Sequence, residues 1–153
     1  MTTFKPLEVS DIPIIVEMMQ EFYAIDSYPI DVEKSKLLFS EFISNKNHGK
    51  GWLICHSDEK GIPKIAGYAI LTFVFSFEYG GTIAFIDELY IKESHRGKGI
   101  GKTSIAFLKA EAAKLSLKLL YLEVENHNST AQKLYLATGF ELHKRNIMKY
   151  KVQ

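Results

Sequence analysis

The segment IDELYIKESHRGKGIGK, residues 86–102, joins an apolar, strand-like run to a glycine-rich loop and then to a helix-like pattern. Gly97, Gly99 and Gly101 occupy alternate positions of this loop, among basic side chains. Glycines let the backbone approach a ligand closely, and the unpaired N–H groups in the first turn of a helix attract anions. The segment therefore predicts a phosphate-binding loop between a strand and a helix.

Two common phosphate-binding loops are excluded by counting. A P-loop needs a glycine five residues before the glycine of its GK[ST] end, and Arg96 occupies that position before Gly101. A dinucleotide fingerprint, G-x-G-x-x-G, would begin at Gly97 and require a third glycine where Lys102 stands. A tight turn that needs its glycines only for backbone conformation remains the alternative to phosphate binding.

The pattern of apolar residues predicts a mixed α/β fold, in which a strand and two helices precede a three-stranded meander and an α, β, α, β ending. Ser10 and Asp31 are the expected N-caps of the first two helices, and the glycines of EYGG, residues 78–81, indicate a hairpin. This order predicts a mixed sheet with helices on both faces. The expected strands are 4–9, 51–57, 64–77, 82–91, 117–124 and 140–152, the last as one strand or a hairpin; the expected helices are 11–24, 31–44, 99–115 and 128–137; a turn is expected at 58–63.

Two motifs together resemble those of the GCN5-related N-acetyltransferase (GNAT) family. The first is R-x-x-G-x-G at residues 96–101, and the second is N-x-x-A-x-x-L-Y-x-x-x-G-F at residues 128–140. The resemblance covers residues 82–140, whereas the first half of the chain matches only in the order of its elements. It implies one N-acetyltransferase domain over residues 1–153, with a mostly antiparallel central sheet that splays apart at the cofactor cleft. It also implies acetyl-CoA as the co-substrate.

The resemblance assigns the cofactor to two segments around the first motif. Main-chain groups of Leu89, Tyr90 and Ile91 are expected to bind the pantetheine arm as an added strand would. Asn128 is expected either to contact this arm or only to cap its helix, which its residue type also suits. The residues expected around the pyrophosphate are Arg96, Gly97, Lys98, Gly99, Ile100, Gly101 and Lys102.

The catalytic residues follow from the resemblance and from the chemistry of amide formation. Tyr135 is the expected general acid, because the leaving thiolate must be stabilised or protonated; the alternative is a core tyrosine. The attacking amine must lose a proton, and Glu88 or its neighbour Asp87 is the expected base. Adjacent strand residues point to opposite faces, so only one of the two can serve unless a bulge intervenes. We favour Glu88, with Glu123 as a further candidate.

The acceptor site is expected between the first two helices and the hairpin, where aromatic and acidic residues suit a cationic amine. A polyamine, an aminoglycoside or a lysine-like compound fits this description. Two alternatives stay open: an acetyltransferase acting on protein N-termini or lysines, and a non-catalytic acyl-CoA-binding module. The expected acceptor-site residues are Tyr23, Asp26, Tyr28 and Tyr79.

Composition excludes several other functions. A net charge of +1 and the absence of a long basic run disfavour nucleic-acid binding. The longest apolar run, residues 65–75, is too short to cross a bilayer as a helix, and we expect a cytoplasmic protein without a membrane partner. The oligomeric state stays open, a homodimer included. No metal is expected, because Cys55 and the five histidines show no metal-ligand spacing.

Overall fold

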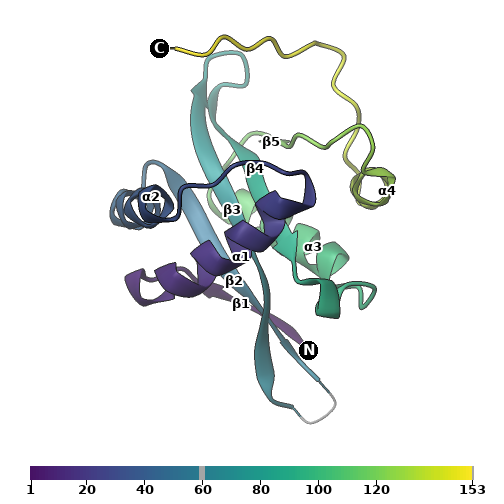
Figure 1. The fold of residues 1–153 in the computed structure, drawn as a ribbon. Helices are drawn as coiled ribbons and strands as arrows, with labels where there is room; N and C mark the ends of the chain where they lie inside the picture. Colours follow the sequence, from purple (N-terminus) through teal and green to yellow (C-terminus); the bar gives the residue numbers. More distant parts are fainter. Residues whose placement is uncertain (59–60, 153) are drawn as a thin grey trace. The chain divides into compact units, whose positions relative to one another are not determined.

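The computed structural model describes residues 1–58 and 61–152, which form two units, Met1–Glu123 and Val124–Gln153. A five-stranded sheet with the strand order β1-β2-β3-β4-β5 lies in the first unit (Figure 1). Strands β1 to β4 form antiparallel pairs, and β5 runs parallel to β4. The strands are β1 (Thr2–Pro6), β2 (Gly49–Ser57), β3 (Pro63–Ser76), β4 (Gly81–Ile91) and β5 (Leu120–Tyr121).

Helices cover both faces of this sheet, as the sequence predicts (Figure 1). Helices α1 (Ile12–Ile25) and α2 (Val32–Ser44) pack on one face, where Ile15, Met18 and Phe39 join Leu53 and Tyr68 of the sheet in one buried cluster. Helix α3 (Ile100–Lys114) packs on the other face. There the Phe107 ring stacks on Phe4 and meets Trp52 edge to face.

The N-terminal end of α1 differs from its prediction. Ser10 lies in a short 3-10 turn (Val9–Asp11), and α1 begins one residue later than predicted, with Asp11 at the N-cap position. The Asp11 carboxylate accepts hydrogen bonds from the Glu8 backbone N–H at 2.9 Å and from the Lys5 ammonium at 2.9 Å. Because a carboxylate accepts more bonds than a hydroxyl does, Asp11 organises this turn. Asp31 does cap α2, accepting from the Lys34 backbone N–H at 3.0 Å.

Strand β5 is much shorter than the predicted strand 117–124. It pairs with β4 only through Ala84–Leu120 and Phe85–Tyr121. From Ile86 to Ile91, β4 has no strand on its β5 side among the described residues. The sheet therefore opens between β4 and β5 beside the glycine-rich loop. The hairpin predicted at residues 78–81 is present and joins β3 to β4. The turn predicted at residues 58–63 includes residues 59 and 60, which lie outside the described residues.

The second unit contains helix α4 (Ser129–Ala137). Gly139 follows it in the left-handed conformation, with φ 87°, as its predicted C-terminal cap requires. The prediction of a strand or hairpin at residues 140–152 is wrong, since none of the described residues there belongs to a strand. An extended segment becomes a strand only when a neighbouring strand completes its hydrogen bonds, and alternation in the sequence does not supply that neighbour.

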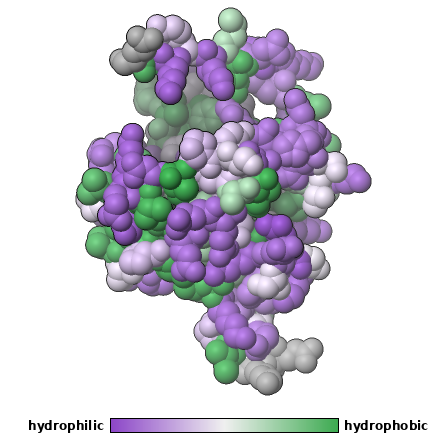
Figure 2. All heavy atoms as spheres, viewed as in Figure 1, coloured by the Kyte–Doolittle hydropathy of each residue, from purple (hydrophilic) through white to green (hydrophobic). Residues whose placement is uncertain are grey.

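No helix of the described residues is both long and apolar enough to cross a membrane. The face shown in Figure 2 is largely hydrophilic, with apolar surface near α2. Leu37 and Leu38 of that helix are exposed.

Candidate active site

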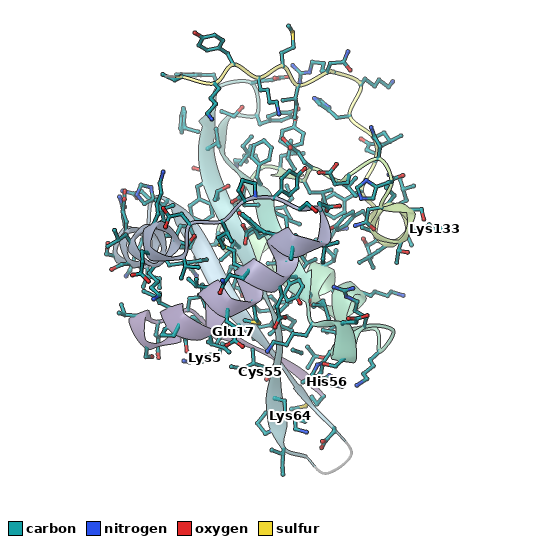
Figure 3. All side chains as sticks on the ribbon, viewed as in Figure 1. Lys5, Glu17, Cys55, His56, Lys64 and Lys133 are labelled. Carbon is teal, nitrogen blue, oxygen red and sulfur yellow. The ribbon has the colours of Figure 1, made fainter. Side chains whose placement is uncertain are left out.

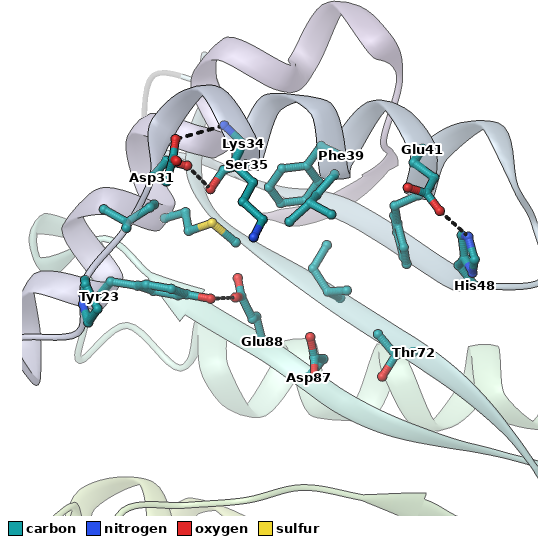
Figure 4. Close-up of a pocket in the computed structure, with 16 residues that line it drawn as sticks. Tyr23, Asp31, Lys34, Ser35, Phe39, Glu41, His48, Thr72, Asp87 and Glu88 are labelled. Carbon is teal, nitrogen blue, oxygen red and sulfur yellow. Dashed lines mark hydrogen bonds and ion pairs between the residues drawn. The ribbon is translucent and has the colours of Figure 1, made fainter. Parts of the chain in front are cut away.

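A cavity of about 430 Å³ lies between helices α1 and α2 and the strands β3 and β4 (Figure 4). Its wall is apolar where Met19, Phe39 and Ile70 contribute, and both predicted bases, Asp87 and Glu88, lie on it. The other lining residues are Tyr23, Pro29, Ile30, Asp31, Lys34, Ser35, Leu38, Glu41, Phe42, His48 and Thr72.

A β-bulge brings both carboxylates to this one cavity. Ile70 of β3 pairs with Glu88, and the next residue, Leu71, pairs with Ile86, so Asp87 is the extra residue in β4. A bulge interrupts the alternation that would turn adjacent side chains to opposite faces. A bulge, the exception that the sequence left open, is therefore present at the position of the two candidate bases.

Glu88 is a buried carboxylate, 8% exposed, held by two tyrosines. Tyr23 of α1 donates to its Oε1 at 2.7 Å, and Tyr68 of β3 donates to its Oε2 at 2.6 Å. Burial raises the pKa of Glu88 above its ordinary value, while the two hydrogen bonds oppose that rise. Burial also raises the pKa of both phenols, so they stay protonated as donors. The result is an ionisable carboxylate of fixed orientation and raised basicity.

Asp87 is in a different environment. Its side chain is exposed and takes part in no ion pair among the described residues. Partial desolvation raises its pKa, and the charge of Glu123 adds to the rise. Glu123, the third candidate base, is itself exposed and lies outside the residues that line the cavity.

The glycine-rich loop presents backbone donors at the start of α3. Gly97 and Gly99 have φ of 75° and 76°, a conformation that favours glycine, and a Cβ on either would meet only open space. The N–H groups of the first turn, Ile100 to Lys102, have no intrahelical acceptor. Burial lowers the pKa of His95, and the neighbouring cations, Lys98 first, lower it further. Open space, free donors and positive charge are what a pyrophosphate requires.

Arg96 is anchored to the strand that precedes the loop. Its Nε donates to the Ile91 carbonyl at 3.0 Å, and its guanidinium lies 6.0 Å from the centre of the Tyr90 ring. The Lys98 ammonium likewise donates to the Ser94 carbonyl at 3.1 Å. These two cations hold the loop in shape as well as adding to its charge.

The open edge of β4 carries two of the three main-chain positions expected to bind pantetheine. The Lys92 N–H donates to Ala66 of β3 at 2.8 Å, and hydrogen bonding alternates along an antiparallel pair. The main-chain groups of Leu89 and Ile91 are therefore directed away from β3, to the side that β5 leaves open. Those of Tyr90 are directed to β3.

The second unit contains the remaining two candidates. Asn128 caps α4 and accepts from the Ala131 N–H at 3.0 Å, which is the structural role that its sequence position also allows. Tyr135 is half-buried, and its ring meets Phe140 edge to face at 5.8 Å. Burial raises the pKa of Tyr135, so its phenol stays protonated through the neutral range.

The cavity includes only part of the predicted acceptor site. Tyr23 lines it, whereas Asp26 and Tyr28 do not, and Tyr79 bonds Tyr121 near the β3–β4 hairpin at 2.7 Å between hydroxyl oxygens. Sequence reasoning missed Tyr68, which lies inside an apolar strand. A buried phenol needs a hydrogen-bond partner, and that was the available signal. Sequence reasoning also missed the residues with polar side chains that line the cavity itself: Asp31, Lys34, Ser35, Glu41, His48 and Thr72.

Cys55, His56 and Lys64 lie at the other end of the β2–β3 pair, apart from the cavity (Figure 3). Burial raises the pKa of the Cys55 thiol, which disfavours the reactive thiolate. Within residues 1–58 and 61–152, no cluster of three or more His, Cys, Asp or Glu side chains is arranged to hold a metal.

Three features of the chain are typical of acyl-CoA-dependent acetyltransferases. They are an opened, mostly antiparallel sheet, a glycine-rich loop at a helix N-terminus, and a buried carboxylate on the adjoining strand. The model of the acetyltransferase (GNAT) family matches residues 15–140. The chain belongs to this family, which confirms the resemblance found in the sequence.

Two curated relatives are similar over part of their length. An uncharacterized N-acetyltransferase of Bacillus subtilis is 43% identical over 58 residues, which are 38% of this chain and 37% of that protein. A thialysine N-epsilon-acetyltransferase of Bos taurus is 32% identical over 77 residues, 50% of this chain and 45% of that protein. The matched segments thus span less than half of these relatives.

Solved structures of the same fold match nearly the whole chain. An integron cassette protein from the mobile metagenome of Cole Harbour Salt Marsh is 25% identical with a TM-score of 0.85, over 98% of this chain and 90% of that one. A predicted acetyltransferase of Clostridium acetobutylicum, solved with acetyl-CoA, is 16% identical with a TM-score of 0.78, over 98% and 96%. An aminoglycoside N-acetyltransferase in complex with CoA is 15% identical with a TM-score of 0.78, over 99% and 95%.

Proposed function

We propose that this protein transfers an acetyl group from acetyl-CoA to the primary amine of a small molecule. The observation that carries the proposal is Glu88, a buried carboxylate held by Tyr23 and Tyr68 on the wall of the cavity. One relative is a thialysine N-epsilon-acetyltransferase and one structural neighbour is an aminoglycoside N-acetyltransferase, so small amines are acceptors elsewhere on this fold.

Acetyl-CoA supplies an acetyl group activated as a thioester. The N–H groups at the start of α3 fit its phosphates. The β4 main-chain edge that β5 leaves unpaired at Leu89 and Ile91 fits its amide groups, with the Ile91 carbonyl also accepting from Arg96. In this proposal the loop 96–102 holds the pyrophosphate, and the β4 edge holds the pantetheine arm.

The proposed chemistry is direct attack by the amine. An alkyl ammonium is mostly protonated at neutral pH, so one proton must leave before the nitrogen can attack. Glu88 accepts this proton, directly or through a water molecule. The nitrogen then bonds to the carbonyl carbon as the carbon–sulfur bond breaks, and Tyr135 gives its phenolic proton to the sulfur. The amine's second proton is lost to water as the amide forms.

The cavity favours a small acceptor over a protein. The cavity is closed on one side by α1 and α2 and on the other by β3 and β4, and its wall includes side chains from all four elements. A cavity of about 430 Å³ has the size of a small-molecule site, whereas an extended peptide is bound along a sheet edge or a longer groove. The paired carboxylates at the bulge, in turn, disfavour a module that only binds acyl-CoA.

The test is thiol release from acetyl-CoA with and without amines, followed by mass analysis of the amine product. Amine-dependent release with matching acetylation supports the proposal. Saturable acetyl-CoA binding without amine-dependent release from any small amine or lysine peptide would identify a binding module instead. Turnover confined to peptides would identify a protein acetyltransferase.

A further inference from the structure

Lys34 extends from α2 into the cavity, on the side opposite the strand that carries Glu88 (Figure 4). It is the third residue of this helix and is solvent-exposed. The helix dipole favours anions and disfavours cations in the first turn of a helix. Glu33, the residue before Lys34, follows this preference, and Lys34 does not. The position of Lys34 is therefore not explained by the stability of α2.

The other charged groups on the helix side of the cavity already have partners. Asp31 accepts the Lys34 backbone N–H as the N-cap of α2. Glu41 is paired with His48 at 3.3 Å. The Lys34 ammonium, in contrast, forms no ion pair within the described part of the chain. The cavity thus presents one unpaired cation on its helix side and carboxylates at the bulge on its sheet side.

We propose that the acceptor is an amino acid or a similar compound with both an amine and a carboxylate, and that Lys34 binds the carboxylate while the amine lies at Glu88 and Asp87. This inference rests on the proposed function and narrows its substrate class. A polycation would place a second ammonium near Lys34, where like charges repel. A zwitterion matches both ends of the charge pattern.

The experiment compares amines that differ only by a carboxylate: L-lysine with cadaverine, L-ornithine with putrescine, and L-phenylalanine with phenethylamine. The measured quantity is kcat/KM from acetyl-CoA thiol release. We expect the wild-type protein to prefer the carboxylate-bearing member of at least one pair by roughly tenfold, the range of one charge-assisted hydrogen bond. The difference should lie in KM, because the carboxylate is bound equally before and during the reaction.

Two variants and a matched control assign this preference to Lys34. Lys34→Met should remove the preference, and Lys34→Glu should reverse it in favour of the decarboxylated amine. Lys36→Glu makes the same charge change two residues away, at a lysine that pairs with Glu33 and does not line the cavity. It should leave the preference intact.

Each result separates this inference from the function on which it rests. Turnover that is indifferent to the carboxylate, or a preference unchanged in Lys34→Glu, would overturn the amino-acid assignment and leave the acetyltransferase in place. If Lys36→Glu loses the preference to the same extent, the preference is a general effect of charge. That result would also overturn the amino-acid assignment. Absence of thiol release with every pair and every other amine would overturn the proposed function itself, and this inference with it.

Discussion

Tyr68 of β3 donates a hydrogen bond of 2.6 Å to Glu88 Oε2 of β4, and Tyr23 of α1 approaches the other oxygen. A helix and two strands are thereby joined through one carboxylate. Tyr68 is fully buried, so its hydroxyl exchanges little with water. The bond orients Glu88 toward the cavity and favours its ionised form, which is the form that can accept a proton.

Removing this hydrogen bond should change the pH dependence of turnover. In Tyr68→Phe the pKa of Glu88 should rise further, because one of the two bonds that oppose the effect of burial is lost. The acid limb of the pH–rate profile should then move to higher pH. The buried acceptor left unsatisfied should also lower the free energy of unfolding by roughly 1–3 kcal/mol.

The matched control is Tyr121→Phe, which removes a tyrosine hydroxyl from the β5 side of the sheet, where it bonds Tyr79. Its pH–rate profile should coincide with that of the wild type. A Tyr68→Phe profile that also coincides, with only stability lowered, would make Tyr68 a packing residue and not a positioning residue for Glu88.

The choice of base is tested by Glu88→Gln beside Asp87→Asn. General base catalysis typically contributes ~100- to 10,000-fold, so Glu88→Gln should lose turnover in that range at neutral pH. Alkaline pH should restore part of it, because more of the amine is then already neutral. Asp87→Asn should lose much less, since Asp87 lacks the tyrosine donors that orient Glu88. If the alkaline-rescued loss follows Asp87→Asn, the two roles are exchanged.

The pH dependence of wild-type turnover should follow the ionisation of Glu88. Glu88 must be ionised to accept a proton, so activity should fall as the pH drops through its pKa, which burial raises above the ordinary glutamate value. The raised pKa has the opposite consequence for folding. The folded protein binds this proton more tightly than the unfolded chain, so Glu88 stabilises the fold at pH values below its unfolded pKa. That contribution is lost as the pH rises to the folded pKa. An acid limb at the pKa of a free glutamate would contradict this account.

Tyr135 is tested by Tyr135→Phe, which keeps the ring and its packing against Phe140. If the phenol protonates the departing sulfur, turnover should fall ~100- to 10,000-fold while acetyl-CoA affinity stays nearly unchanged. Steady-state kinetics measures turnover, and calorimetric titration measures acetyl-CoA affinity. Turnover close to the wild-type rate would make Tyr135 a packing residue of the second unit.

The loop is tested by charge reversal at the start of α3. Lys102→Glu should weaken acetyl-CoA binding by roughly tenfold or more, because it puts a negative charge beside the free N–H groups that face the phosphates. Lys114→Glu makes the same change at the opposite end of this helix and should bind as the wild type does. At a hundredfold excess over its dissociation constant, acetyl-CoA should also raise the free energy of unfolding by roughly 2.7 kcal/mol. Equal affinities for the two variants would remove the loop from the binding site.

The local pattern of the sequence determined most of the elements that surround the site. The residues of the loop and of the hairpin before β4 could be read directly, because glycine conformations and helix starts depend on near neighbours in the chain. The cap at Asp31 followed for the same reason. The two motifs also identified the family, since both lie on short, contiguous segments.

Only the tertiary structure decided how Glu88 is held. Tyr23, Tyr68 and Glu88 are 45 and 20 residues apart in the sequence, and strand pairing with helix packing brings them together. The bulge at Asp87 depends on the register between β3 and β4, and the opening beside β4 depends on where β5 stops pairing. Lys34 reaches the cavity because α2 packs over the sheet. Register, pairing length and packing are properties of distant segments in contact, so no local pattern in this sequence could specify them.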